Sequence, residues 1–432
     1  MSKSNHSDHT GKPKKIWSSL GPGILFAGAA IGVSHLVQST RAGAVFGLGL
    51  LGIVIFANLF KYAAFRFGPH YAATTGQTLV RGYRLRGRWT VAVFGVAMLL
   101  SCIIIMAAVG ITTSGLVNAV FGINLPMQFV AAILVAAAAI LLWFGGYKIL
   151  SKLSKIFVAI LTITTFIATI LVLPQVDWTF YPPSAPPLTL ASFGFIIALM
   201  GFMPSPVELS VLTSTWSVAQ QKETGHRATT KEWVLDFNIG FLGSALLAIC
   251  FLIMGAGVMH AQNVVPEDNA VRFAAQIIDL YKATLGEWSG LVVGISALMV
   301  MITTVLTVLD GYARVLVEVV REWRYEPTAS PPSSREEANV LLVFLLIIPF
   351  GAALILLFLM GSFQEFIDFT TIISFIIGPF IAFLNHISIN GPEVPIELRP
   401  ARWLNIWSIV GICIMTSFTA AYLFARFIWG IG

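Results

Sequence analysis

Charge is scarce in this 432-residue chain, because Asp, Glu, Lys and Arg together make up 11% of it. An average soluble domain carries roughly 25% charged residues. Hydrophobic residues make up 57% of the chain. This small number of charged side chains cannot cover the surface of a water-soluble globule of this length. The composition therefore excludes an ordinary soluble protein. It indicates a chain that folds within a lipid bilayer.

Cysteine is scarce as well, and the three that occur, Cys102, Cys250 and Cys413, fall in apolar segments without CxxC spacing. Neither a disulfide framework nor a zinc site is therefore expected. The sequence also lacks a glycine-rich phosphate loop, an HExxH motif and a Ser/His/Asp arrangement within one compartment. Because those motifs carry most recognisable chemistry, we expect neither an enzyme nor a bound cofactor.

Long apolar runs dominate what is present. A bilayer core of ~30 Å takes about 20 apolar helical residues to cross. Eleven runs of suitable length are centred near residues 33, 57, 103, 134, 162, 203, 245, 303, 349, 374 and 416. The first 15 residues are polar and basic, and the run after them is too long for the core of a signal peptide. We therefore predict a disordered cytoplasmic leader over 1–15 and a single membrane domain over 16–432.

The basic surplus, a net charge of +6, follows the connections between the runs. Only 4 of the 26 basic residues fall in outer segments when the N-terminus is placed in the cytoplasm. They are Arg41, Arg272, Lys282 and Arg426. Basic residues concentrate in cytoplasmic loops of membrane proteins. The distribution therefore predicts a plasma-membrane protein with its N-terminus inside and its C-terminus outside, and it needs no nucleic-acid partner.

Three connections have distinct compositions. Residues 174–190 are Pro-rich without Lys or Arg, and we expect an irregular outer loop. Residues 265–288 place apolar side chains at helical spacing, which predicts an amphipathic helix on the outer surface. Residues 321–339 are polar and rich in Pro and Ser, which predicts a linker on the inner side. None is long enough to form a separate soluble domain.

Two apolar runs are interrupted at mid-length. The first carries "GVSH" at 32–35, and the sixth carries "MGFMPSP" at 200–206, where two prolines must end or kink a helix. A broken helix at membrane depth is tolerated only where it faces protein or a water-filled cavity. Paired interruptions in two halves are typical of transporters built from inverted repeats, with the substrate between the broken helices. We place the repeats at about 20–173 and 190–387, with an extra helix at about 402–429.

The residues around both interruptions resemble the Nramp (natural-resistance-associated macrophage protein) family of divalent metal transporters. The family's first span reads GPxxxxxxAxxDPGNxxTxxQAGAxxGxxLLWxxxxAN, and this chain has "GPGILFAGAAIGVSHLVQSTRAGAVFGLGLLGIVIFAN" from Gly21 to Asn58. Its sixth-span motif, built around Met-Pro-His, is similar to "FMPSPVELSV" at 202–211. The resemblance covers nearly the whole chain. It implies an all-α membrane protein with a LeuT-like bundle of five plus five inverted spans, eleven transmembrane helices in total, and helices 1 and 6 broken.

The family's metal ligands are only partly retained. By resemblance, the Asp of DPGN falls on Gly32 and the Asn falls on His35. The Met of Met-Pro-His is kept as Met203, and the ligating backbone carbonyl falls on Met200. The two sixth-span histidines of the family fall on Ser205 and on the serine at position 210, and its third-span acidic relay falls near the valine at position 109. The resemblance therefore implies a remodelled site and does not support proton coupling.

We interpret the chain as a secondary transporter that moves a divalent metal cation by alternating access. The predicted substrate-binding residues are Gly32, Val33, Ser34, His35, Met200 and Met203. His35 and Met203 are the expected side-chain contacts to the transported ion. An imidazole, a thioether and carbonyl oxygens suit a softer or later transition metal better than a hard one.

Four further residues are candidates for coupling or gating. Glu208 and Asp310 are carboxylates within apolar runs, where ionisable groups are expensive and usually functional. A capping or gating role is the alternative for Glu208, and an i,i+4 pair with Arg314 is the alternative for Asp310. Arg41 and Ser205 complete the set.

Two basic residues of the second run need separate mention. Lys61 and Arg66 lie towards its inner end. Long basic side chains near the ends of membrane helices commonly extend to the aqueous interface. We therefore expect both to snorkel.

A different substrate remains an open alternative. Without the aspartate at Gly32, the site no longer repels a carboxylate, and free amides at a helix N-terminus attract anions. The chain would then carry a small organic solute such as an amino acid or an organic acid, with Thr303, Thr304 and Thr307 supplying oxygens for a coupling Na⁺. A non-transporting scaffold or sensor is the third alternative, because a protein that has lost its transport activity would also lose its metal ligands.

Overall fold

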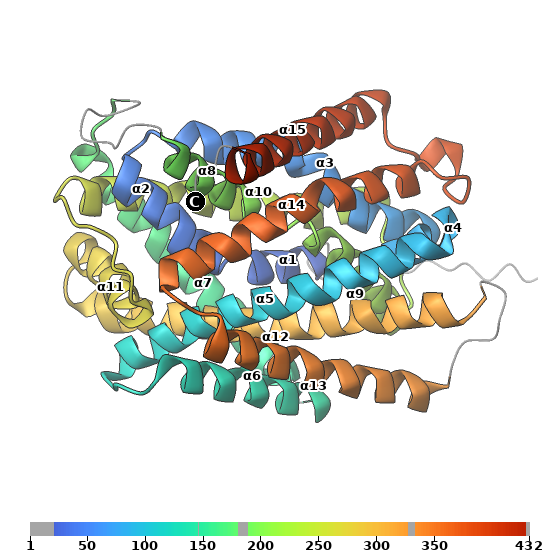
Figure 1. Ribbon diagram of the computed structural model, residues 1–432, viewed down its shortest axis with the longest axis horizontal. Helices are drawn as coiled ribbons and strands as arrows, with labels where there is room; N and C mark the ends of the chain where they lie inside the picture. Colours follow the sequence, from blue (N-terminus) through green and yellow to red (C-terminus); the bar gives the residue numbers. More distant parts are fainter. Residues whose placement is uncertain (1–20, 146, 180–188, 327–332, 429–432) are drawn as a thin grey trace, which may run out of the picture.

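The computed structural model describes residues 21–145, 147–179, 189–326 and 333–428. Within them the regular elements are helices, and the long ones run roughly along the same direction through the molecule (Figure 1). The predicted leader 1–15 lies outside the described residues, as do 180–188 of the Pro-rich connection and 327–332 of the predicted linker.

The predicted spans are present as helices. Nine helical segments of the described residues are long and apolar enough to cross a bilayer, and two shorter apolar helices occupy the remaining predicted positions. The α-helices are α1 Pro22–Ala30, α2 Thr40–Phe46, α3 Leu51–Thr75, α4 Leu79–Arg86, α5 Arg88–Phe121, α6 Met127–Trp143, α7 Tyr147–Val172, α8 Leu190–Gly201, α9 Leu209–Thr224, α10 Thr230–Met254, α11 Ala270–Leu285, α12 Trp288–Arg324, α13 Ser334–Phe358, α14 Phe363–Ile389 and α15 Arg402–Phe427. Two π-helical segments are also present: η2 Val33–Ser39 leads into α2, and η4 Gly255–His260 continues α10.

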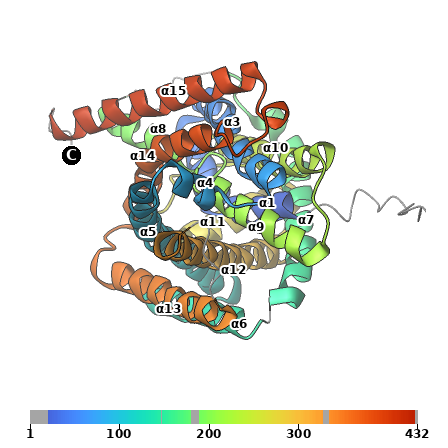
Figure 2. The same cartoon turned by 90° about the vertical axis from the view of Figure 1, so that its right-hand side faces the viewer.

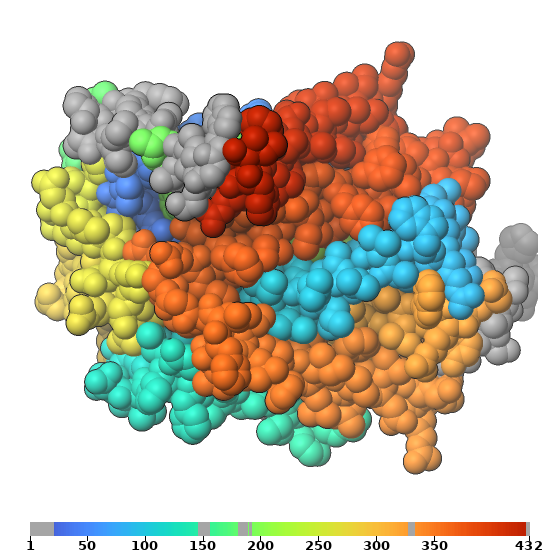
Figure 3. Space-filling view, in the orientation of Figure 1, coloured from blue at the N-terminus to red at the C-terminus, as the bar shows by residue number. Residues whose placement is uncertain are grey.

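The helices form a bundle around α1. Helix α1 packs on α9, α10 and α12. Helices α6 and α13 lie side by side at one edge, and α15 lies at the opposite edge against α3 and α14 (Figure 2). In the space-filling view, α14 and α5 cross the middle of the face, and part of α2 is visible beside α11 (Figure 3). Residues 30–44 of the first span are buried, so its interruption lies inside the bundle, where protein rather than lipid surrounds it.

The first span is interrupted, as predicted, although the interruption is shorter than the "GVSH" stretch. Helix α1 ends at Ala30, Ile31 is extended with φ −75° and ψ 94°, and Gly32 is neither helical nor extended with φ −167° and ψ −125°. The following residues already belong to η2, in which the backbone winds more widely than in an α-helix. Only Ile31 and Gly32 therefore leave the helical conformation.

The sixth span is interrupted over a longer stretch. Helix α8 ends at Gly201, and α9 does not begin until Leu209. Pro204 and Pro206 lie between them. A proline lacks an amide donor and clashes with the preceding turn, so two prolines this close together prevent a continuous helix. The predicted break is confirmed.

The predicted outer amphipathic helix is α11. Its buried residues are Ala270, Phe273, Ala274, Ile277, Ile278, Leu280 and Tyr281. The helical spacing of the sequence predicts a buried face made of Val271, Ala274, Ala275, Ile278, Tyr281 and Leu285. Three of these, Ala274, Ile278 and Tyr281, are buried, and the other three are only half-buried. Helix α11 packs on α5 and α12 and lies at one end of the bundle, opposite α4 (Figure 1).

Glycine allows the first span to approach α10 closely. A Cβ atom at Gly43 would lie 1.9 Å from the carbonyl oxygen of Leu252, and one at Gly23 would lie 2.0 Å from the carbonyl oxygen of Asp236. Without these glycines the backbones could not make contact. Small residues at helix interfaces commonly have this role in membrane proteins.

We predict that Gly43→Leu lowers the free energy of unfolding by about 1–3 kcal/mol, because the added side chain overpacks a backbone contact. Gly243→Leu is the matched control, since a Cβ atom at Gly243 on α10 has no atom within 4 Å. Thermal denaturation of both variants in detergent is the measurement. Equal melting temperatures would contradict the close approach of α2 and α10.

Candidate functional site

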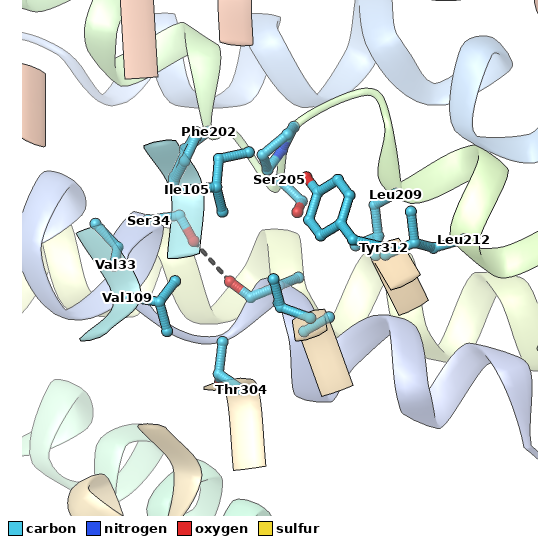
Figure 4. A pocket seen from close by; sticks show the side chains of 14 residues that line it. Val33, Ser34, Ile105, Val109, Phe202, Ser205, Leu209, Leu212, Thr304 and Tyr312 are labelled. Atoms are coloured by element: carbon cyan, nitrogen blue, oxygen red, sulfur yellow. Dashed lines mark hydrogen bonds between the residues drawn. The ribbon is translucent and has the colours of Figure 1, made fainter. Parts of the chain in front are cut away.

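A small pocket, with free space of about 30 Å³, lies between the two interrupted spans. Helices α5 and α12 complete its wall, and the labelled side chains converge on it in Figure 4. Its lining consists of Ala29, Ala30, Val33, Ser34, Ile105, Val109, Phe202, Ser205, Pro206, Leu209, Leu212, Thr304, Val308 and Tyr312. The walls are largely apolar, and the polar groups that line them are hydroxyls. Two interrupted spans and one enclosed pocket are the arrangement that the sequence predicted.

Ser34 faces the pocket, whereas His35 is fully buried beside it. The Ser34 hydroxyl lies 2.6 Å from the Ala30 carbonyl oxygen (Figure 4) and 2.7 Å from His35 Nδ1. His35 Nε2 lies 2.8 Å from the Ser244 carbonyl oxygen. Because a carbonyl oxygen only accepts, Nε2 carries a proton. Both ring nitrogens therefore have partners within the protein.

Met203 lies against the first interrupted span. Its sulfur is 3.8 Å from the Ser39 hydroxyl, which in turn is 3.1 Å from the Ser34 carbonyl oxygen. A Cβ atom at Gly32 would lie 3.3 Å from Cγ2 of Thr304, a pocket-lining residue. The structure thus brings Gly32, Ser34 and Met203 to the same region.

Lys61 takes the backbone carbonyl that the family resemblance assigned to the ion. Its side chain is fully buried, and Nζ donates to the carbonyl oxygens of Met200 at 2.5 Å and Gly201 at 2.9 Å. The prediction that Lys61 snorkels to the interface is wrong. The Lys61 amine donates instead to two backbone carbonyls at the end of α8, and the Met200 carbonyl also accepts from the Met203 amide at 3.4 Å.

Glu208 is fully buried at the start of α9. The Ser101 hydroxyl donates to Oε1 at 2.6 Å, and Oε2 has no hydrogen-bond partner among the described residues. Glu208 attracts Lys61 electrostatically. Its side chain makes no capping hydrogen bond to α9, so the capping alternative is wrong.

The other coupling or gating candidates are placed as follows. Asp310 pairs with Arg314 at 2.8 Å, which confirms the i,i+4 alternative. Ser205 lines the pocket between the two prolines of the sixth span. Arg41 pairs with Asp368 on α14 at 2.7 Å. Sequence analysis missed Asp368, although a carboxylate near the outer end of the tenth run was a usable signal.

Gln38 and Gln364 extend the Arg41 contact. The Arg41 guanidinium also donates to Gln38 Oε1 at 3.1 Å and to Gln364 Oε1 at 3.0 Å. It lies 4.9 Å from the ring centroid of Phe195. This network ties α2 to α14 and α8 on the side of the pocket that faces α11.

The described part of the site offers a metal ion few of the side chains that usually bind metals in proteins. Across the described ranges, no group of three or more His, Cys, Asp or Glu side chains gathers in a way that could hold a metal ion. The polar side chains that line the pocket are the hydroxyls of Ser34, Ser205, Thr304 and Tyr312. Oxygen ligands of this neutral kind compensate a divalent charge less well than carboxylates do.

Comparisons with known proteins agree with this architecture. An uncharacterised protein of Pasteurella multocida, PM0681, is 34% identical over 96% of this chain and 95% of its own length. A solved variant of the Eremococcus coleocola manganese transporter superposes with a TM-score of 0.65 at 15% identity, covering 98% of this chain and 91% of that chain. MhsT in complex with L-phenylalanine superposes with a TM-score of 0.62 at 13% identity, covering 92% of this chain and 98% of that chain.

These structural neighbours confirm the predicted LeuT-like fold of a multi-pass membrane protein. The family model described as natural resistance-associated macrophage protein-like (Nramp) matches residues 23–425. With both interrupted spans and the pocket between them inside that range, the chain belongs to the Nramp family.

Proposed function

We propose that this protein is a secondary transporter that carries a divalent metal cation across the membrane by alternating access. The observation that supports it is the pocket enclosed by two interrupted spans. In transporters of this kind, substrates bind where discontinuous helices meet near the bilayer midplane. Family membership and the manganese transporter named among the structural neighbours favour a metal ion as the cargo.

The orientation we propose has the N-terminus in the cytoplasm and the C-terminus outside, in the plasma membrane. Helix α4 and the start of α5 carry Arg81, Arg84, Arg86 and Arg88 at the end of the bundle opposite α11 (Figure 1). Basic residues favour the cytoplasmic side. The α4 end is therefore the inner end, and the Arg41–Asp368 pair lies towards the outside.

The proposed cargo contacts are the Ser34 hydroxyl, the Ser205 hydroxyl and the Met203 sulfur. His35 reaches the ion only if it exchanges one of its two hydrogen bonds, since both ring nitrogens have protein partners. Neutral oxygen and sulfur ligands favour a later transition metal over Mg²⁺. We therefore expect selectivity for softer ions among the divalent cations.

Uptake by proteoliposomes tests this cargo site. We predict that Met203→Ala and His35→Ala each reduce uptake of Mn²⁺, Fe²⁺ or Co²⁺ by about tenfold or more, as losing a metal contact or its support usually does. Met98→Ala is the matched control, because Met98 on α5 is a buried methionine outside the two interrupted spans. Full uptake by both variants would place the cargo elsewhere.

A second variant restores what the site lacks. We predict that Gly32→Asp tightens Mn²⁺ binding by about tenfold or more, because a carboxylate compensates the charge of a hard divalent ion. The new side chain has to displace the Thr304 methyl group slightly, since the Cβ contact is 3.3 Å. Gly32→Asn is the control with similar size and no charge. Isothermal titration of both proteins measures the difference, and equal affinities would contradict a cargo site at position 32.

A small organic solute is the second candidate, and Lys61 is the observation that favours it. The ammonium group occupies the Met200 carbonyl and repels a nearby divalent cation. Most of the pocket wall is apolar, including Val33, Val109 and Phe202. Melting temperatures measured with divalent metals, amino acids and organic acids separate the candidates, because a ligand that binds the folded state raises the melting temperature. Stabilisation by organic solutes alone would overturn the metal proposal.

The charge balance beside the pocket is also open to test. We predict that Lys61→Met lowers the free energy of unfolding by about 1–3 kcal/mol, because two buried carbonyls lose their donor. Adding Glu208→Gln should recover part of this loss, since Glu208 no longer has a cation to balance it. Lys231→Met on the exposed start of α10 is the control. Additive effects in the double variant, measured by thermal denaturation, would show that Lys61 and Glu208 are not coupled.

A further inference from the structure

A second cavity lies at the α4 end of the bundle, where α4, α9 and α12 contact one another (Figure 2). Its free space is about 360 Å³. Its described lining comes from α9, α12 and α13 and from the residue before α4, and none of that lining comes from α1. We call this space the α4-side cavity.

Charged side chains of both signs line the α4-side cavity, namely Lys222, Arg314, Glu318, Arg321 and Glu337. The Arg321 guanidinium donates to Glu318 and lies 3.9 Å from Glu337. Nearly half of the Arg314 side chain, 49%, is exposed. Charged groups inside membrane proteins face one another or a water-filled space. The α4-side cavity is therefore an aqueous space at this end of the bundle.

The α4-side cavity comes close to the pocket between the interrupted spans. Along α9, the pocket lining ends at Leu212 and the cavity lining begins at Thr215. Three residues of an α-helix rise by about 4.5 Å. Along α12, the corresponding residues are Tyr312 and Arg314. Less than one helical turn therefore separates the two spaces along both helices.

A contact between apolar atoms of α9 and α12 closes this gap. A Cβ atom at Gly311 would lie 2.6 Å from Leu212 Cδ2 and 2.9 Å from Trp216 Cζ2. Both side chains therefore rest directly on the main chain of α12, and both are buried. In the sequence, Gly311 lies between Val308 of the pocket lining and Arg314 of the cavity lining. Because the touching atoms are apolar, parting them leaves no hydrogen-bonding group without a partner.

We propose that Leu212 and Trp216, resting on Gly311, form a gate between the pocket and the α4-side cavity. Helix α9 begins after the break of the sixth span, whereas α12 is continuous from Trp288 to Arg324. A tilt of α9 away from α12 lifts both side chains off Gly311 and joins the two spaces. Passage of cargo through the gate rests on the proposed transport function, whereas the connection between the two spaces does not.

Thiol labelling of the full-length protein in proteoliposomes tests this gate. The native cysteines Cys102, Cys250 and Cys413 are first replaced by alanine. In this background, Val308→Cys places a thiol in the pocket, and Thr215→Cys places one in the α4-side cavity. The reagent is trimethylammonioethyl methanethiosulfonate, whose permanent charge keeps it from crossing the bilayer. It is added to one side of the membrane at a time.

We expect Thr215→Cys to react quickly from one side, which identifies the side of the cavity, and Val308→Cys to react slowly from both. Adding Trp216→Ala should accelerate the Val308→Cys reaction from the cavity side by about tenfold or more, because a buried group reacts only in the molecules that expose it. Phe26→Ala is the matched control, since it removes a fully buried aromatic ring from α1.

The alternatives are separable. Fast labelling of Val308→Cys with Trp216 in place, an unchanged rate in Trp216→Ala, or equal acceleration by Phe26→Ala would overturn the gate. If Trp216→Ala does not fold, Leu212→Ala removes the other side chain of the gate and carries the same expectation. Labelling needs no transport, so the expected rates together with an absence of metal uptake would reject the metal cargo and leave the gate standing.

Discussion

An interrupted helix inside a bilayer depends on finding partners for its backbone, because lipid offers none. In this protein, neighbouring helices supply those partners as polar side chains. Asp236 on α10 accepts amide hydrogens at the start of α1, Thr304 on α12 meets the carbonyls at its end, and Lys61 on α3 meets the carbonyls at the end of α8. These buried polar side chains lie at helix ends, where backbone amides and carbonyls need hydrogen-bond partners.

The same requirement explains how the binding region differs from the pattern of its family. By resemblance, the family's ligating aspartate falls on Gly32, and the fully buried Lys61 lies behind the sixth span. Glu208, which is also fully buried, attracts Lys61 electrostatically. The pocket itself is left with hydroxyls and apolar surface. For the transport site that we propose, selectivity would then come from shape and neutral dipoles more than from net charge.

The sequence predicted the helical class, the spans and both interruptions because these depend on local composition: apolar length, proline and glycine. The Asp310–Arg314 pair was also predictable, since both residues lie on one helix face. Lys61 was misjudged because its partner at Met200 is 139 residues away, and no local pattern reveals such a contact. The engagement of His35 with Ser244 was hidden for the same reason, at a separation of 209 residues.

The glycine contacts decide which parts can shift independently. Gly23 and Gly43 place both halves of the first span directly on the main chain of α10, and Gly255 in η4 repeats the contact from the other side with Thr40. Main chains touching at several heights cannot slide past each other without collision, so the first span and α10 form one rigid body. Helix α1 also packs on α12, where the Thr304 hydroxyl meets the carbonyls of Gly28 and Ile31. The alternating access that we propose would separate such a side-chain contact more easily than the glycine-packed side, where main chains touch.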